Sequence, residues 1–165
     1  MEDIKIELNG KNFKYRVNGI VIKDSKILAL KRKNNDSYCL PGGHVELGED
    51  SKEAIIREML EETKTKVSIK NELAIIEFFY IDRNNSETHE ISFYYIVEPQ
   101  DFSSISKDKF SITQMDKGIL KQHNLEWLKI SSLKDIDFRP SFIKTKIING
   151  DYNFEHAIIK KDHIF

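Results

Sequence analysis

The chain has 165 residues, of which 39% are hydrophobic and 10% aromatic, enough to fill the core of one domain. Its 26 basic and 27 acidic side chains nearly balance, so no long-range field favours nucleic acid or an anionic membrane as a partner. A single cysteine, Cys39, excludes an internal disulfide and a cysteine-rich zinc site.

The chain lacks the signals of export and of membrane insertion. Its first residues, MEDIKIELNGK, are charged, and no apolar run approaches the roughly 18 residues that cross a bilayer. With the lone cysteine, this favours a cytoplasmic location. We expect one domain over residues 1–165, without repeats or linkers, and the oligomeric state stays open between a monomer and a homodimer.

Strands are predicted at the start of the chain. Residues 4–16 alternate apolar and polar side chains around Asn9-Gly10, which predicts a β-hairpin because both turn positions tolerate positive φ. Apolar runs at 17–22 and 26–30 predict a second strand pair. The basic cluster that follows is best interpreted as a solvated strand end, and Arg32 is our candidate in it for contact with a ligand phosphate.

A glycine-rich loop comes next. Gly42, Gly43 and Gly48 allow backbone conformations and close approaches that side chains would forbid. Carbonyl and N–H groups of this loop can therefore contact a metal ion or an oxyanion directly. His44 lies inside the same loop and, with Gly42, is a candidate for contact with the substrate.

A helix is predicted directly after the loop. Asp50 and Glu53 have the spacing of a capping box, which places the helix start near Ser51. Glu49 precedes the helix, where its charge suits the positive end of the helix dipole. Arg57, two turns on, is a plausible partner for Glu49; the alternative is an exposed ion pair worth under about 1 kcal/mol.

Three carboxylates share one face of this helix. At about 100° per residue, Glu58, Glu61 and Glu62 lie together, and the opposite face is predicted to carry the apolar contact, with Ile56, Met59, Leu60 and Thr63. A solvated acidic surface would explain such a face, but like charges at this spacing repel by a few tenths of a kcal/mol. A divalent cation relieves the repulsion, and carboxylate oxygens suit Mg²⁺, or Mn²⁺ in its place.

The second half of the chain predicts further strands and one helix. Residues 73–81 and 91–97 are apolar at odd and even positions, which is typical of strands covered on both faces. Residues 100–124 are polar with little periodicity, and we interpret them as an irregular loop, an insertion or a lid. The remaining expected elements are a strand at 125–130, a helical turn at 131–133 and a helix at 141–148 with Pro140 at its first position.

The loop and helix together carry a family resemblance. The pattern consists of Gly43, five residues, Glu49, seven residues and then Arg57-Glu58-Met59-Leu60-Glu61-Glu62. It resembles the Nudix box of MutT-like hydrolases, which cleave a nucleoside diphosphate linked to another moiety. The resemblance implies an α/β (α+β) fold with a mixed β-sheet between helices. It also implies attack of a metal-activated water on the diphosphate.

The resemblance assigns roles residue by residue. Glu58, Glu61 and Glu62 correspond to the metal ligands, and Glu58 is also a candidate general base. Gly43 would offer its backbone carbonyl to the metal, and Arg57 with Glu49 would orient the site. The chain departs from the family where Lys64-Thr65 replaces the usual glycine and aliphatic residue, so either a lysine is forced to positive φ, at roughly 1 kcal/mol, or the helix runs on.

Signals outside the box are weaker. Glu90 could add a metal or water contact from the opposite side of the cleft, and its alternative is a solvent-facing strand start. Tyr80 lies near the distance from the box at which dinucleoside polyphosphate hydrolases tend to carry a tyrosine, but aromatic side chains in such strands are mostly core. The other histidines after His89, including His123, are interpreted as peripheral.

The resemblance predicts a Mg²⁺-dependent pyrophosphohydrolase of a small nucleotide. A nucleoside triphosphate or an oxidised nucleotide is slightly favoured over ADP-ribose or a dinucleoside polyphosphate. The alternative is a Nudix-fold module that senses a nucleotide without cleaving it; loss of a catalytic carboxylate would favour that alternative, and this chain has lost none.

Overall fold

The computed structural model describes residues 2–32, 36–82, 84–116 and 118–163. Its strands are β1 (Lys5–Leu8), β2 (Lys11–Ile20), β3 (Ile22–Lys23), β4 (Lys26–Lys31), β5 (Tyr38–Cys39), β6 (Gly42–His44), β7 (Val67–Ile81), β8 (Glu87–Pro99), β9 (Lys109–Asp116), β10 (Ile119–Lys129), β11 (Phe138–Arg139) and β12 (Glu155–His163). The helices are α1 (Ser51–Thr63) and α2 (Ser141–Ile148), with short 3-10 helices η1 (Ser103–Ile105) and η2 (Ile130–Asp135). In these ranges neither α-helix is long and apolar enough to cross a bilayer.

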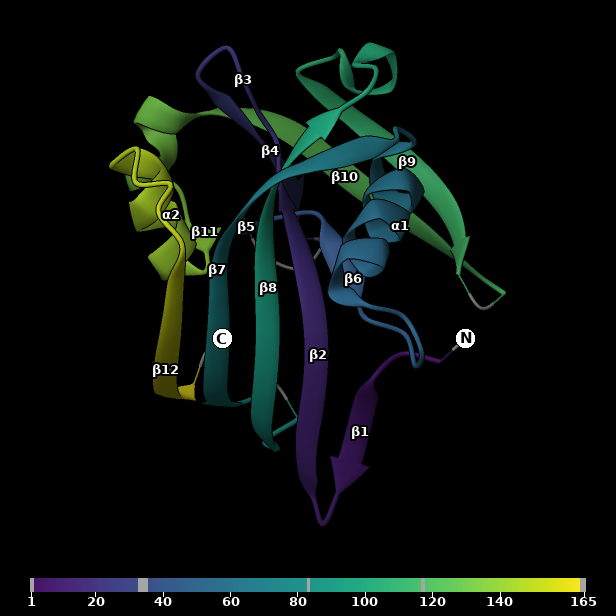
Figure 1. Cartoon of the computed structure of the whole chain (residues 1–165), viewed down its shortest axis with the longest axis vertical. Helices are drawn as coiled ribbons and strands as arrows, with labels where there is room; N and C mark the ends of the chain where they lie inside the picture. The colour runs from purple at the N-terminus through teal and green to yellow at the C-terminus, as the bar shows by residue number, and fades with distance from the viewer. Residues whose placement is uncertain (1, 33–35, 83, 117, 164–165) are drawn as a thin grey trace.

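The strands form two mixed sheets (Figure 1). The first has the order β1-β2-β8-β7-β12, with β6 paired to β2, and its β2·β8 and β7·β12 pairs are parallel. The second has the order β11-β5-β4-β10-β9, with β3 paired to β4. The expected α+β fold with a mixed sheet between helices is confirmed, and the sheet is divided in two.

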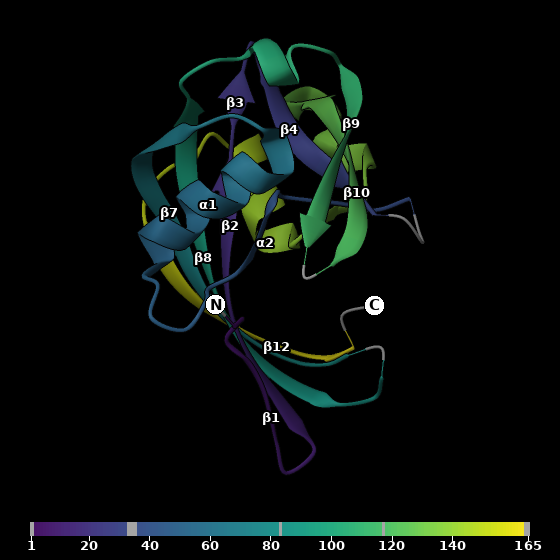
Figure 2. The ribbon, with the colours of Figure 1, turned by 90° about the vertical axis from the view of Figure 1, so that its right-hand side faces the viewer.

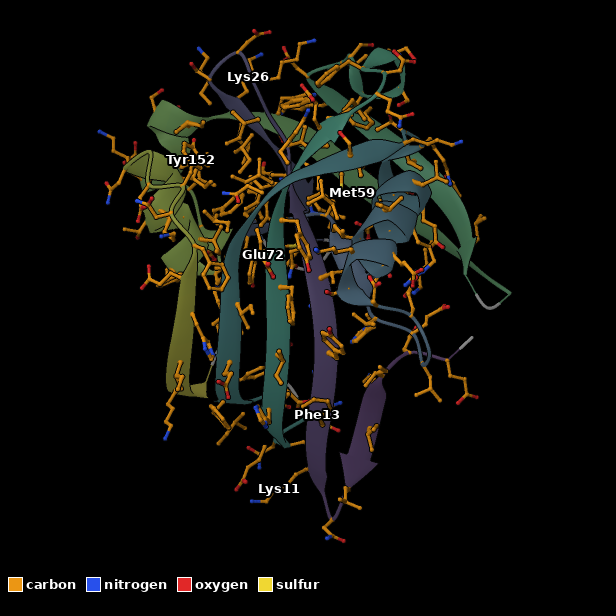
Figure 3. The ribbon with its side chains drawn as sticks, in the orientation of Figure 1. Lys11, Phe13, Lys26, Met59, Glu72 and Tyr152 are labelled. Atoms are coloured by element: carbon orange, nitrogen blue, oxygen red, sulfur yellow. The ribbon has the colours of Figure 1, made fainter. Side chains whose placement is uncertain are left out.

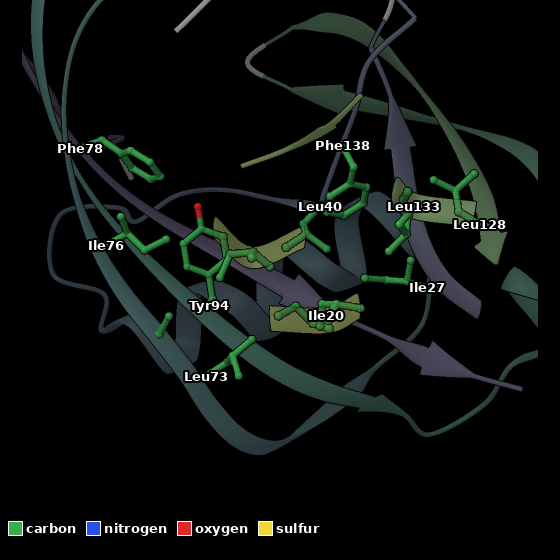
Figure 4. Packing of buried hydrophobic residues seen from close by; sticks show 14 of the residues in the cluster. Ile20, Ile27, Leu40, Leu73, Ile76, Phe78, Tyr94, Leu128, Leu133 and Phe138 are labelled. Atoms are coloured by element: carbon green, nitrogen blue, oxygen red, sulfur yellow. The ribbon is translucent and has the colours of Figure 1, made fainter. Parts of the chain in front are cut away.

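The helices lie on opposite sides of the sheets, as the two views show (Figures 1 and 2). Ala54, Ile55 and Met59 of α1 pack into one hydrophobic cluster, and Ile143 and Ile147 of α2 pack into another (the latter cluster is drawn in Figure 4). Burying the apolar stripe of each helix against a sheet face removes apolar surface from water. This burial stabilises the fold by about 25 cal/mol per Å² of apolar surface. The molecule therefore has two cores, one under each α-helix, and strands of both sheets contribute to each core.

Strand β2 separates the two sides of the molecule. Val17 packs into the cluster of α1, whereas Ile20 packs into the cluster of α2. Because side chains alternate along a strand, Arg16 and Asn18 point to the same side as Ile20. The long ends of β2 and β8 extend beyond both helices, and Figure 3 shows Lys11 and Phe13 there, far from Met59 of α1.

The predicted start of α1 is confirmed by its cap. The carboxylate of Asp50 accepts the N–H groups of Lys52 and Glu53 at 2.8 and 2.9 Å, and the side chain of Glu53 accepts the N–H of Asp50 at 3.1 Å. The helix ends because Lys64 takes a left-handed conformation, with φ 58°, and its N–H bonds the carbonyl of Leu60. Of the two alternatives expected at the end of the helix, a lysine at positive φ is the one observed.

The predicted apolar face of α1 is wrong in part. Ile56 and Leu60 are each 41% exposed, whereas Met59 and Thr63 are buried as expected. The buried stripe is rotated toward the acidic side, so that Glu62 is only 6% exposed. The physical reason is the surface that α1 meets: it packs on β2, β6, β7 and β9 together, and Met59 lies against Gly19, where a Cβ would come within 2.5 Å of its sulfur.

The predicted irregular loop at 100–124 is wrong. This segment holds η1 and most of the antiparallel hairpin β9–β10, which pairs Phe110 with Leu125 and Ile112 with His123. Strand β9 pairs only with β10, so it is an edge strand, and edge strands are often polar. The edge strand β12 was also not predicted, and Pro140 is the cap of α2 rather than its first residue.

The hairpin at Asn9-Gly10 is confirmed, with β1 and β2 in antiparallel register. The second strand pair forms between β3 and β4, because the 17–22 run is divided between the end of β2 and the short β3. The strands predicted at 73–81 and 91–97 are present and longer than expected. The expected helical turn after the last strand is η2.

Candidate active site

Gly43 and Glu58 form the centre of the candidate site. A Cβ built on Gly43 would lie 2.2 Å from Oε1 and 2.6 Å from Oε2 of Glu58. Any other residue type at position 43 would therefore displace the carboxylate. The structure thus brings the backbone of β6 against Glu58 on the acidic face of α1.

Glu62 is held from two sides. Its Oε2 accepts the N–H of Gly42 at 2.7 Å, and its Oε1 lies 3.1 Å from Nδ1 of His123. Gly42 has φ 141° and a Cβ there would lie 2.2 Å from the carbonyl oxygen of Val17, so only glycine fits. Interpreting His123 as peripheral was wrong, because its Nδ1 contacts Glu62 and its side chain is only 15% exposed.

Arg57 joins the loop to the helix. Its Nε and one terminal nitrogen contact the two oxygens of Glu49, both at 2.8 Å, and that terminal nitrogen also donates to the carbonyl of His44 at 3.0 Å. The other terminal nitrogen lies 3.0 Å from Oε1 of Glu58 and 3.6 Å from Oε1 of Glu61. The predicted Arg57–Glu49 pair thus forms, and the Glu49 side chain is only 7% exposed, unlike an exposed ion pair.

The carboxylates of the site differ in their proton affinity. Burial, followed by the charge of Glu62, raises the pKa of Glu58 to about 7, against the opposing effect of Arg57. Burial would also raise the pKa of Glu49, but hydrogen bonds from Arg57 and from the N–H of Glu46 outweigh it and lower that pKa. Glu58 is therefore a group that can hold or release a proton near neutral pH.

The donor set fits a hard divalent cation. Glu58 lies against the backbone of Gly43, Glu62 accepts the N–H of Gly42, and Glu61 lies on the same face of α1. Mg²⁺ is commonly held by a few carboxylates together with water and phosphate oxygens. Within the described ranges no three acidic, histidine or cysteine side chains converge as a closed metal cage. Arg57 instead contacts both Glu58 and Glu61, at 3.0 and 3.6 Å.

Glu90 lies apart from this cluster. It is 7% exposed rather than solvent-facing, and its two oxygens accept the hydroxyl groups of Tyr80 at 2.9 Å and Ser92 at 2.6 Å. Burial would raise its pKa, but the charge of Arg16 and the hydrogen bonds from Ser92 and Tyr80 together outweigh that effect, and the pKa of Glu90 is lowered. Its neighbours are on the α2 side of β2, and a metal role for Glu90 stays a prediction.

A cavity of about 550 Å³ occupies the α2 side. Apolar walls come from Leu40, Phe78, Tyr94 and Phe138, and Figure 4 shows Phe78 and Tyr94 facing Leu40 and Phe138. Polar and charged lining residues include the predicted substrate contacts Arg32 and Tyr80, together with Arg16, Asn18, Glu90, Asp137, Arg139 and Lys144. Leu40 lines the cavity and is followed in the sequence by Pro41 and Gly42, and the N–H of Gly42 donates to Glu62. This short segment therefore connects the cavity to the acidic cluster.

His44 contributes to the loop through its backbone. Its carbonyl accepts a hydrogen bond from Arg57, whereas its Nε2 is buried without a hydrogen-bond partner in the described part of the chain. Burial and then Arg16 lower the pKa of His44 to about 4. The imidazole is therefore neutral at physiological pH, and contact of His44 with a substrate stays a prediction.

Comparison with known proteins identifies the class. Residues 13–142 match the model of the NUDIX domain, which is more than half of the chain, so the chain belongs to the NUDIX family. The match includes the whole loop, helix α1 and every described residue that lines the cavity except Lys144 and Ile159.

The chain is 48% identical over 62 residues to an ADP-ribose pyrophosphatase of Methanocaldococcus jannaschii, which is 36% of this chain and 37% of that protein. It is 39% identical over 59 residues to a protein of Bacillus subtilis described as a candidate 8-oxo-dGTP diphosphatase, covering 35% of this chain and 40% of that one. The alignments thus span well under half of these relatives.

Solved structures agree with the fold. A NUDIX hydrolase from Nitrosomonas europaea superposes with a TM-score of 0.62 at 20% identity, over 90% of this chain and 79% of that chain. A MutT protein from Bacillus halodurans superposes with a TM-score of 0.61 at 19% identity, over 90% of both chains. At this identity the likeness concerns the fold alone.

Proposed function

We propose that this protein is a Mg²⁺-dependent pyrophosphohydrolase that cleaves the diphosphate linkage of a nucleotide. The observation that carries the proposal is the close fit of the Glu58 carboxylate against Gly43, with Arg57 bracing that carboxylate on Glu49. Glu62 of the same helix accepts the N–H of Gly42, which supports a shared role of loop and helix. Both relatives are described as enzymes that act on a diphosphate linkage, which supports the same class.

The acidic residues and Arg57 of α1 have different roles in this proposal. Glu58, Glu61 and Glu62 would hold the cation, and the bound cation would neutralise phosphate charge and lower the pKa of an attacking water. Glu58 is our candidate for the group that takes a proton from that water; its pKa is raised to about 7 without a bound cation, and a cation would lower it. Glu62 keeps its orientation through Gly42 and His123. Arg57 fixes the distance between loop and helix.

The cavity on the α2 side would take the nucleoside. Its aromatic walls, Phe78, Tyr94 and Phe138, are of the kind that stack on a base, and the volume of about 550 Å³ suits a nucleoside-sized group. The descriptions of the two relatives make ADP-ribose and 8-oxo-dGTP the first substrates to test. Our sequence-based preference for a nucleoside triphosphate or an oxidised nucleotide stays a prediction.

A substrate panel tests the proposal. The purified chain would be incubated with and without Mg²⁺ with dGTP, 8-oxo-dGTP, ADP-ribose, diadenosine polyphosphates and nucleotide sugars, and the products would be separated by chromatography. We expect cleavage of at least one of them that requires the cation. Binding without cleavage of any would favour a nucleotide-sensing module instead.

A further inference from the structure

The outer edge of strand β1 is open. β1 pairs with β2 along one side, and no strand in the described ranges pairs with its other side. All four residues of β1 are exposed, and Figures 1 and 2 show the β1–β2 hairpin projecting beyond both helices. An open edge presents backbone N–H and C=O groups that can pair with a further strand.

This edge offers the backbone groups of Lys5 and Glu7. The N–H of Tyr15 on β2 donates to the carbonyl of Ile4 at 3.1 Å, so the backbone carbonyl of Ile4 points toward β2. Because this direction alternates along a strand, the backbone groups of Lys5 and Glu7 point outward. The N–H of Lys5 donates locally to the carbonyl of Asp3 at 2.8 Å. An incoming strand would therefore meet the carbonyl of Lys5 and the N–H and carbonyl of Glu7.

The side chains of β1 are complementary to a second copy of the same strand. In an antiparallel pair of β1 strands centred on Ile6 and related by a two-fold axis, Lys5 lies opposite Glu7 of the second copy, and Glu7 lies opposite its Lys5. Opposite charges directly across a sheet stabilise the pairing of the strands. Centring the pair on Lys5 or on Glu7 would instead place two identical charges opposite each other. The charges therefore select one register.

The hairpin of a single chain does not supply these charge pairs. Within it, Lys5 lies opposite Lys14, which has the same charge, and Glu7 lies opposite Asn12, which has none. A second β1 strand would place an opposite charge across from both Lys5 and Glu7. Charged residues on an edge strand usually prevent pairing with other chains, but the spacing of these two favours pairing with an identical strand.

Exposed apolar side chains surround the same edge. Ile6 is 52% and Leu8 is 69% exposed, and both lie on one face of β1. Leu47 is 72% exposed and lies in the neighbouring loop, where its N–H donates to the carbonyl of Glu2 at 2.8 Å. In the register centred on Ile6, the two Ile6 side chains are neighbours across the axis, and Leu8 lies opposite Ile4 of the second copy. Pairing would remove part of this apolar surface from water.

We propose that the chain forms a two-fold symmetric homodimer through antiparallel pairing of its β1 strands. The strands of the first sheet then continue into those of the second copy. Residues 5–8 do not line the cavity on the α2 side, so this inference is independent of the proposed function. The interface adjoins the loop of the candidate site, because Asp3 bridges to Glu46, whose N–H donates to Glu49 at 3.0 Å.

Sedimentation velocity of the parent protein tests the dimer. The measurement would cover protein concentrations from about 1 to about 500 μM, because an interface of two short strands is small and dissociates on dilution. We expect the average mass to rise from that of the monomer to that of the dimer across this range. A parent protein that stays monomeric at every concentration would overturn the inference.

Two charge reversals assign the dimer to β1. Lys5→Glu and Glu7→Lys each place like charges opposite one another on both sides of the axis, and each should raise the dissociation constant of the dimer at least about tenfold. An equimolar mixture of the two variants should form heterodimers about as well as the parent dimerises, because each strand of one variant then meets opposite charges on the other. Parental dimerisation of either variant alone, or a mixture that stays monomeric, would contradict the proposed register.

Lys134→Glu is the matched control. It makes the same charge change as Lys5→Glu, at an exposed position on η2. We expect this variant to dimerise like the parent. If it weakens the dimer as much as Lys5→Glu does, net charge rather than pairing at β1 explains the effect, and the inference is wrong. Circular dichroism of each variant excludes unfolding as the cause of lost association.

Discussion

Nδ1 of His123 lies 3.1 Å from Oε1 of Glu62, and both side chains are nearly buried, with 15% and 8% exposed. This contact joins the hairpin β9–β10 to helix α1. Glu62 is thereby held between a histidine on one side and the N–H of Gly42 on the other. The hairpin is thus part of the candidate site.

Replacing His123 tests the value of this contact. We expect His123→Ala to raise the Mg²⁺ concentration for half-maximal turnover about tenfold, because Glu62 loses one of the two partners that orient it. His156→Ala is the matched control, since His156 pairs with Glu77 on the opposite side of the molecule at an exposed position. Identical Mg²⁺ dependence of parent and His123→Ala would remove His123 from the site.

Gly43→Ala tests the close fit at Glu58. The added methyl group would meet the carboxylate, so we expect turnover to fall by at least about a hundredfold while the fold is kept. The double variant Gly43→Ala, Glu58→Asp shortens the acidic side chain and should relieve the clash, which would appear as partial recovery of the thermal shift caused by Mg²⁺. An alanine variant with parental activity would show that the close approach has no functional role.

Arg57→Lys separates charge from geometry. Lysine keeps the positive charge but cannot make the paired contacts with Glu49 or reach Glu58 and the carbonyl of His44 at the same time. We expect a loss of about 1–3 kcal/mol in the free energy of unfolding and a larger loss of turnover. Urea unfolding and steady-state kinetics measure the two effects. A fully active lysine variant would mean that charge alone suffices.

The raised pKa of Glu58 predicts how stability depends on pH without metal. Between its ordinary pKa of 4.5 and about 7, folded Glu58 keeps a proton that the unfolded chain has released. Relative to Glu58→Gln, the parent should therefore lose free energy of unfolding as pH rises from about 5 to about 8. Urea unfolding in EDTA at several pH values measures this difference. A constant difference between the two proteins would contradict the raised pKa.

Local signals in the sequence predicted local structure well. The Asn9-Gly10 turn, the capping box of Asp50 and Glu53, and the loop–helix spacing of Gly43 and Glu58 each depend on residues close together in the chain. The contact of Arg57 with Glu49 could also be predicted from the sequence, because both residues lie within two turns of the helix start.

Features that depend on tertiary packing were missed. The edge strand β9 is largely polar; among its described side chains, Phe110 and Ile112 pack against the core, so its sequence resembles a loop. His123 could not be placed without that hairpin. The face of α1 that is buried depends on the four strands it meets, which helical periodicity alone does not specify.

We propose that the carboxylates of α1 hold a cation that supports cleavage of a diphosphate. ³¹P NMR of ADP-ribose and of 8-oxo-dGTP with the parent protein and with Glu58→Gln, each with Mg²⁺ and with EDTA, tests this directly. We expect monophosphate-ester or pyrophosphate products from at least one substrate, only with the parent and only with Mg²⁺. Equal product formation by Glu58→Gln, or by the parent in EDTA, would contradict it.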